Sequence, residues 1–100
     1  MDNSQSQNEN KGIQIKVTDE VLAGKYSNMA QISHNREEFV LDFITILPPA
    51  GTLNSRIIMS PGHYKRMIKA MQENLRRYEE SFGEVKESSE PETIHGFPVK

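Results

Sequence analysis

One segment near the middle of the chain constrains the fold more than any other. Residues 38–47 read EFVLDFITIL, with apolar side chains at both odd and even positions. A strand that is apolar on both faces lies inside a sheet and is covered on each side by another layer. Asp42 is the exception, and a buried carboxylate needs a partner. The segment therefore predicts a central strand that carries one structural ion pair.

Three further strands are expected beside this central one, because short runs of alternating apolar and polar residues precede and follow it. These runs span residues 13–17, 25–33 and 52–59. Polar turns at residues 34–37 and 48–51 connect the later strands as hairpins. Arg56 then lies on the same face of the sheet as Asp42, so we expect these two side chains to pair.

A long helix is expected after the last strand. Ser60 suits the N-cap, Pro61 suits the first helical position, and Gly83 suits the position after the last turn. Between them, apolar residues recur at helical spacing and form one stripe; they are Tyr64, Met67, Ile68, Met71, Leu75, Tyr78 and Phe82. The sequence thus predicts an α+β fold, a four-stranded, mainly antiparallel sheet crossed by one C-terminal helix.

The two ends of the chain differ from its middle in composition. They are mostly polar or charged, and such segments bury too little apolar surface to offset the entropy of ordering. We expect a disordered N-terminal tail at residues 1–11, one domain at 12–83 and a flexible C-terminal tail at 84–100. The chain has no cysteine and a net charge of −2, and none of its apolar runs reaches bilayer length. These features favour a cytoplasmic protein.

One face of the expected sheet has no obvious cover. The helix protects only one side, and a domain of this size has a thin core. The other side carries Val40, Ile44, Ile46 and Ile58. An exposed apolar patch of this kind usually marks an interface. We therefore expect a homodimer, or a partner protein that covers this face.

The sequence offers little that would support catalysis. His34, His63 and His95 are far apart and lack the spacing of metal ligands. Ser55 and Ser60 stand in no nucleophile motif. We therefore expect no enzyme activity, no metal and no cofactor.

A basic edge along the helix is the clearest candidate for a binding surface. Lys65, Lys69 and Arg76 share this edge, and His34 and Arg36 occupy the turn before the central strand. Such a surface can meet phosphates or an acidic protein. Glutamates at positions 73 and 80 lie beside the edge, which leaves open a second interpretation, a solvated helix face stabilised by ion pairs.

Several motifs resemble a small bacterial and archaeal family, catalogued as domain of unknown function 3467. They are GKYSN at 24–28, SH at 33–34, EEFVLDF at 37–43, SRIIMSP at 55–61, YE at 78–79 and FG at 82–83. The resemblance covers residues 13–83 and implies no established activity. It implies a link to transcription, because in one large bacterial group these genes lie beside those of the large RNA polymerase subunits.

A weaker likeness concerns the fold alone. The last expected strand, which ends in SRIIMS, and the helix ending RRYEESFG are similar to one repeat of the Pur-alpha, Whirly and positive-cofactor-four group. Proteins of that group bind single-stranded nucleic acid through surfaces richer in basic and aromatic residues than this one. The likeness therefore implies an arrangement of strands and helix more than it implies a function.

Two functions follow as hypotheses. The first is a non-enzymatic, transcription-associated accessory protein that contacts RNA polymerase, nucleic acid or both through the basic helix edge and the 34–36 turn. The second is a structural or adaptor homodimer that mediates protein–protein interaction and has no role on nucleic acid.

Overall fold

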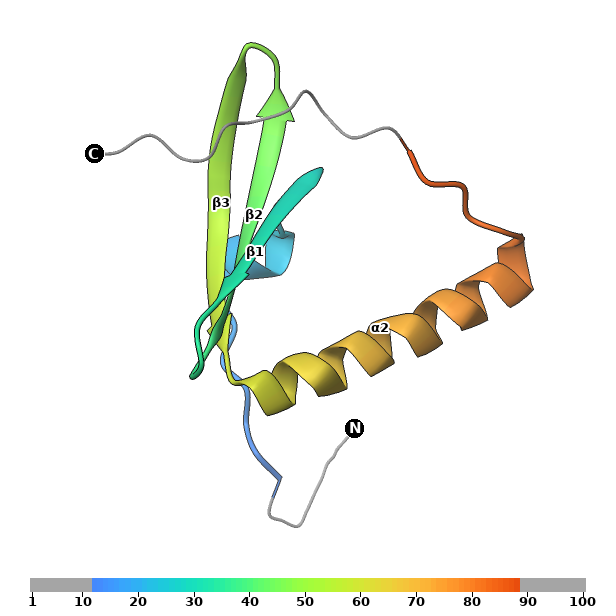
Figure 1. Cartoon of the computed structure of the whole chain (residues 1–100), viewed down its shortest axis with the longest axis horizontal. Helices are drawn as coiled ribbons and strands as arrows, with labels where there is room; N and C mark the ends of the chain where they lie inside the picture. Colours follow the sequence, from blue (N-terminus) through green and yellow to red (C-terminus); the bar gives the residue numbers. More distant parts are fainter. Residues whose placement is uncertain (1–11, 89–100) are drawn as a thin grey trace.

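A computed structural model describes residues 12–88 of the chain (Figure 1). Within this part, three strands form one antiparallel sheet in the order β1-β2-β3. The elements are α1 (Asp19–Ala23), β1 (Met29–His34), β2 (Phe39–Leu47), β3 (Ala50–Met59) and α2 (Pro61–Phe82). The fold is therefore α+β, with an antiparallel sheet followed by a C-terminal helix, as predicted. The expectation of four strands is wrong for the described residues, which contain three.

The missing strand is the one expected at residues 13–17. Its apolar side chains are largely exposed, at 92% for Ile13, 86% for Ile15 and 57% for Val17. The next residues form α1, which Thr18 caps by accepting a hydrogen bond from the Val21 amide at 3.3 Å. Alternation alone is a weak signal, because an extended segment becomes a strand only where a sheet edge pairs with it.

β1 begins later than expected, and just before it side chains supply most of the hydrogen bonds to β2. Asn28 Nδ2 donates to the Ile46 carbonyl at 3.0 Å, and Asn28 Oδ1 accepts from the Ile46 amide at 2.9 Å. Ser27 Oγ donates to the carbonyl of Ile44 at 3.1 Å. The SN of the GKYSN motif thus extends the contact with β2 beyond the end of the ladder.

A bulge in β3 sets the register of the sheet. Ile44 pairs with Leu53, but Phe43 pairs with Ser55, so Asn54 is the extra residue of β3. The shift places Arg56 directly opposite Asp42. Without the extra residue, continuation of the hairpin register would place Ser55 there instead. The bulge therefore aligns the two charged residues that the sequence predicted to pair.

α2 has the bounds that its capping residues predict. Ser60 Oγ accepts from the His63 amide at 3.2 Å, Pro61 starts the helix, and Gly83 ends it with φ 94° and an amide that donates to the Glu79 carbonyl at 2.9 Å. The position of the helix differs from the expectation. Figure 1 shows α2 leaving the end of β3 and running away from the sheet, and none of its residues is buried.

The core is confined to the middle of β2. Leu41, Ile44 and Ile46 are buried there together with Asp42. Two residues of the expected interface face, Ile44 and Ile46, are thus already covered within one chain. On the same face, Val40 is half-buried and Ile58 is 54% exposed.

The two predicted tails lie mostly outside residues 12–88. Residues 1–11 and 89–100 lie outside the described part of the chain. Residues 84–88, where the expected C-terminal tail starts, contain no helix or strand.

Candidate functional site

The Asp42–Arg56 pair belongs to the interior of the sheet. Arg56 Nε donates to Asp42 Oδ1 at 2.7 Å, and Nη2 donates to Oδ2 at 3.0 Å. The carboxylate side chain is 6% exposed and the guanidinium side chain 52%. The hydrogen bonds to Asp42, and then the charge of its carboxylate, raise the pKa of Arg56. This bidentate geometry fixes the pairing of β2 with β3 and leaves one edge of the guanidinium open to solvent.

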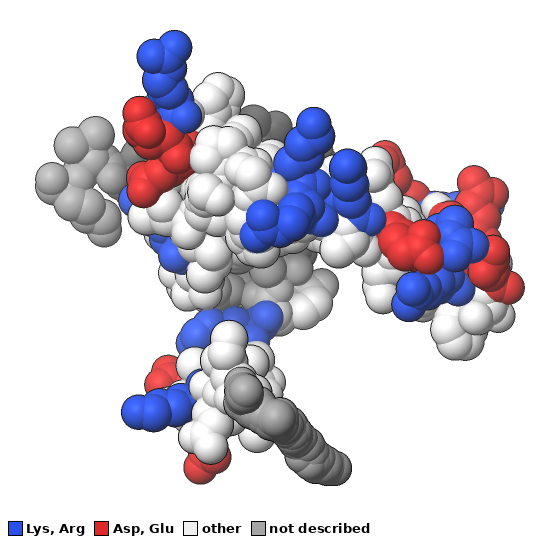
Figure 2. Space-filling model, turned by 90° about the horizontal axis from the view of Figure 1, so that it is seen from below, with Lys and Arg blue, Asp and Glu red and all other residues white. Residues whose placement is uncertain are grey.

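The first half of α2 carries positive charge that no nearby acid neutralises. Lys65, Arg66 and Lys69 lie in a stretch without Asp or Glu before Glu73. Within the described residues, none of the three forms an ion pair. The N-terminus of a helix adds a partial positive charge of its own. Figure 2 shows Lys and Arg gathered where α2 begins, with acids mixed among them further along the helix.

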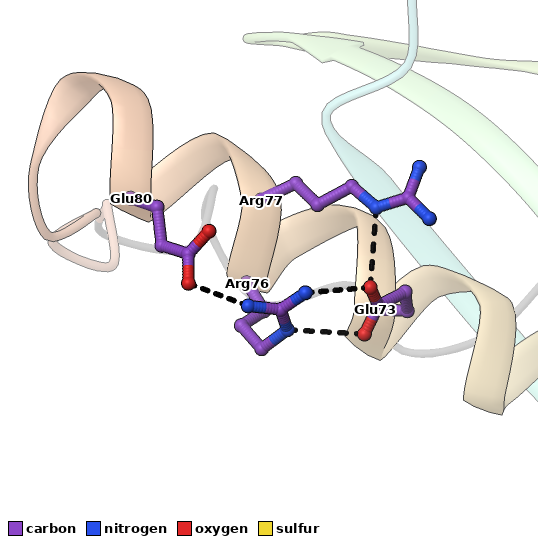
Figure 3. Close-up of polar contacts among 4 residues, drawn as sticks. All are labelled: Glu73, Arg76, Arg77 and Glu80. Atoms are coloured by element: carbon purple, nitrogen blue, oxygen red, sulfur yellow. Dashed lines mark hydrogen bonds and ion pairs between the residues drawn. The ribbon is translucent and has the colours of Figure 1, made fainter.

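The second half of α2 has the opposite character, because its charges pair with one another (Figure 3). Arg76 Nε and Nη2 donate to the two oxygens of Glu73 at 3.0 and 2.7 Å, and Nη1 donates to Glu80 at 2.5 Å. Arg77 Nε donates to Glu73 Oε2 at 3.1 Å. Hydrogen bonds from Arg76 and then from Arg77 lower the pKa of Glu73 from its ordinary value of 4.5. Arg76, expected on the basic edge, is thus engaged with acids.

An aromatic stack joins the start of β2 to the first turn of α2. The His34 ring lies 5.2 Å from that of Phe39, and Phe39 stacks on Tyr64 with ring centroids 4.0 Å apart and 7° between the planes. Asn35 Oδ1 fixes the turn by accepting from the amides of Glu37 and Glu38 at 2.7 and 2.9 Å. His34 therefore lies beside an aromatic stack that includes Tyr64 in the first turn of α2, whereas within residues 12–88 no hydrogen bond or ion pair brings Arg36 to the helix.

Sequence reasoning missed Arg66 as a member of this surface. Its signal was present, since Arg66 lies three residues before Lys69 in the same acid-free stretch. Arg66 Nη2 lies 3.1 Å from His63 Nδ1, one turn earlier in the helix. We call Lys65, Arg66 and Lys69 the basic half of α2.

A second feature is an open groove between the α1 region and the sheet. Its volume is about 510 Å³, and its apolar lining includes Val21, Tyr26, Phe43 and Ile57. Asn54, the bulge residue, donates from Nδ2 to the Tyr26 carbonyl at 2.7 Å and so anchors one wall. Part of the GKYSN motif is therefore structural, because the residues of the motif that line the groove connect the α1 region to the sheet.

Two kinds of site are absent from the described part of the chain. Among residues 12–88, no three His, Cys, Asp or Glu side chains lie close enough together to hold a metal ion. Neither helix there combines the length and the apolar content needed to cross a bilayer.

These features define a class of protein, a small α+β domain with a three-stranded antiparallel sheet and a protruding amphipathic C-terminal helix. The chain belongs to the family described as "Protein of unknown function (DUF3467)", whose model matches residues 1–87. The family resemblance noted in the sequence is thereby confirmed. No curated protein and no solved structure matches the chain.

Proposed function

We propose that this chain is a non-enzymatic accessory protein of transcription that binds nucleic acid or RNA polymerase through the basic half of α2. The observation that supports this proposal is the contrast within one helix. Arg76 and Arg77 are held by glutamates, whereas Lys65, Arg66 and Lys69 form no ion pair among the described residues. Unpaired cations at the positive end of a helix favour an anionic partner. The link to transcription rests on the family resemblance.

The size of the basic surface limits the kind of binding. Three cations contact few phosphates, so the affinity for nucleic acid is modest and depends weakly on salt, with a slope of about −2 to −3 in log K against log salt. We expect no sequence-specific readout, because the basic half of α2 would contact phosphates and would not reach base edges in a groove of the nucleic acid. The surface suits a protein that attaches to a larger complex already located on nucleic acid.

The test is a pull-down of the tagged chain from an extract of its source cells, with and without nuclease, at low and moderate salt. Recovery of RNA polymerase subunits after nuclease treatment supports the polymerase as partner. Recovery that requires intact nucleic acid supports binding to nucleic acid. Recovery of neither overturns the proposal.

A matched pair of variants locates the surface. Arg66→Glu/Lys69→Glu reverses two charges on the basic half of α2, and Lys16→Glu/Lys86→Glu makes the same change of net charge elsewhere. We expect the first variant to lose the partner and the second to retain it. Equal loss in both variants would show that net charge, and not this surface, governs the binding.

A second candidate function is an adaptor homodimer without a role on nucleic acid. The observation in its favour is the exposure of apolar side chains along α2, such as Met71 at 55% and Phe82 at 75%. A pull-down that recovers only a second copy of the chain would favour this candidate.

A further inference from the structure

From Met71 onward, the apolar stripe of α2 has no cover within the described part of the chain. Met71 is 55% exposed, Leu75 48%, Tyr78 50% and Phe82 75%. Only the first turn of the helix stacks on the sheet through an aromatic pair, Tyr64 on Phe39. A single residue, Ser60, separates β3 from α2 and caps the helix. Residues 12–88 therefore leave most of the stripe open to a partner.

The spacing of the stripe indicates a helix as its occupant. Its residues alternate intervals of four and three, in the order Tyr64, Ile68, Met71, Leu75, Tyr78 and Phe82. Intervals that alternate between four and three put two apolar positions in every seven residues, which is the heptad pattern of a seam between paired helices. We call these six residues the α2 seam.

The seam is bordered by a depression in the surface. Ala70, Met71, Leu75, Tyr78 and Val85 line this shallow depression. Val85 is held there because its amide donates to Glu79 Oε2 at 3.0 Å. This shallow apolar surface widens the area that a facing helix could bury.

The flanks of the seam favour a second copy of the same helix in antiparallel orientation. One flank carries Lys65, Gln72 and Glu79 at intervals of seven residues. A two-fold axis beside Gln72 would place Lys65 of each copy opposite Glu79 of the other, because in a two-fold interface residue i meets j and j meets i. The other flank carries Met67, Asn74 and Ser81 and has no charge to repel.

We propose that two copies of this chain form a homodimer by antiparallel pairing of their α2 seams. The two sheets then lie at opposite ends of the helix pair, so they do not compete for space. On a helical wheel, Arg66 and Lys69 lie away from the centre of the seam. They stay exposed in the dimer and remain free for an anionic partner, whereas Lys65 would face Glu79 of the other copy. The dimer does not require the anionic partner, so either proposal can fail alone.

The first test uses the unmodified chain. Sedimentation or light scattering is expected to give twice the chain mass of 11.4 kDa, and the thermal midpoint is expected to rise with protein concentration. A folded chain with the monomer mass at every concentration tested would overturn the proposal.

The second test reads the role of the seam through one apolar residue. Leu75→Glu places a charge in the seam and is expected to give a monomer. Its matched control, Ile13→Glu, introduces the same charge at a residue that is 92% exposed and is expected to stay dimeric. An unchanged mass for Leu75→Glu would place the interface elsewhere.

The third test reads the orientation of the two helices. Lys65→Glu and Glu79→Lys each replace two attractive contacts by repulsive ones, and each is expected to weaken the dimer about tenfold. The double variant Lys65→Glu/Glu79→Lys restores opposite charges and is expected to recover the affinity. If the double variant does not recover the dimer affinity, the antiparallel arrangement is wrong. The same result is expected if a sheet of the other copy, and not its α2, covers the seam.

A cysteine provides an independent check of the same arrangement, since the natural chain has none. Gln72→Cys lies beside the proposed axis and is expected to form a disulfide-linked dimer on mild oxidation. Glu80→Cys lies on the opposite side of the helix and is expected to remain free. A link through position 80 and none through position 72 would contradict the proposal.

Discussion

The sheet and α2 differ in how far their own chain covers their apolar residues. β2 lies between two neighbouring strands, and its central residues, such as Ile44 at 3% exposure, are covered within one chain. α2 has an apolar stripe of comparable strength in sequence, but none of its residues is buried. The difference shows that an amphipathic pattern determines which face of an element is apolar. The connection of that element to its neighbours determines whether the same chain can pack on that face.

The largest expected effect tests the self-covered region. Ile44→Ala removes side-chain volume from the buried centre of β2 and should lower the free energy of unfolding by about 3 kcal/mol. Urea denaturation followed by circular dichroism measures this loss. Ile13→Ala, at a largely exposed position, is the control and should change stability little. Similar losses in the two variants would mean that β2 holds no core.

A smaller effect is expected at the start of α2. Ser60→Ala removes the oxygen that accepts from the His63 amide and should cost about 1 kcal/mol. Ser60→Asp retains an acceptor and should recover most of the loss. The helical signal and the thermal midpoint report the change. If Ser60→Ala were neutral, pairing along the α2 seam, and not capping, would set the stability of the helix.

The stack between the two regions should contribute less. Tyr64→Leu keeps an apolar residue at the position but removes ring stacking on Phe39, and should cost about 0.5 to 1 kcal/mol. Amide hydrogen exchange is the sharper measurement, because protection should fall in both the first turn of α2 and the 34–39 turn. Loss confined to the helix would show that the stack does not couple the two regions.

The smallest effect is a pH dependence in the second half of α2. The pKa of Glu73 is lowered by its bonds with Arg76 and Arg77, so the stabilisation is present above the ordinary pKa of 4.5 and is lost as pH falls through the lower, folded-state value. The helical signal of the natural chain should therefore decline in acid more than that of Glu73→Gln, which has no such carboxylate. Parallel acid profiles in the two proteins would contradict this assignment.

The accuracy of the sequence predictions followed the range of the interactions involved. Ser60, Pro61 and Gly83 mark the ends of α2 because capping depends on neighbouring residues alone. The prediction of a strand at residues 13–17 is wrong because a strand needs a sheet edge distant in sequence to pair with, and alternation does not specify that edge. The approach of β2 to the start of α2 depends on the Phe39–Tyr64 stack, which no local pattern predicts.

The sequence by itself determined the α+β class, the bounds of α2 and the need of Asp42 for a partner, because these follow from periodicity, caps and the cost of burying a charge. Tertiary structure alone decided where that partner stands, since the extra residue Asn54 shifts the register and brings Arg56 opposite Asp42. It also decided that α2 leaves the sheet, because the direction of a helix after a one-residue connection depends on packing at its first turn and not on its own stripe.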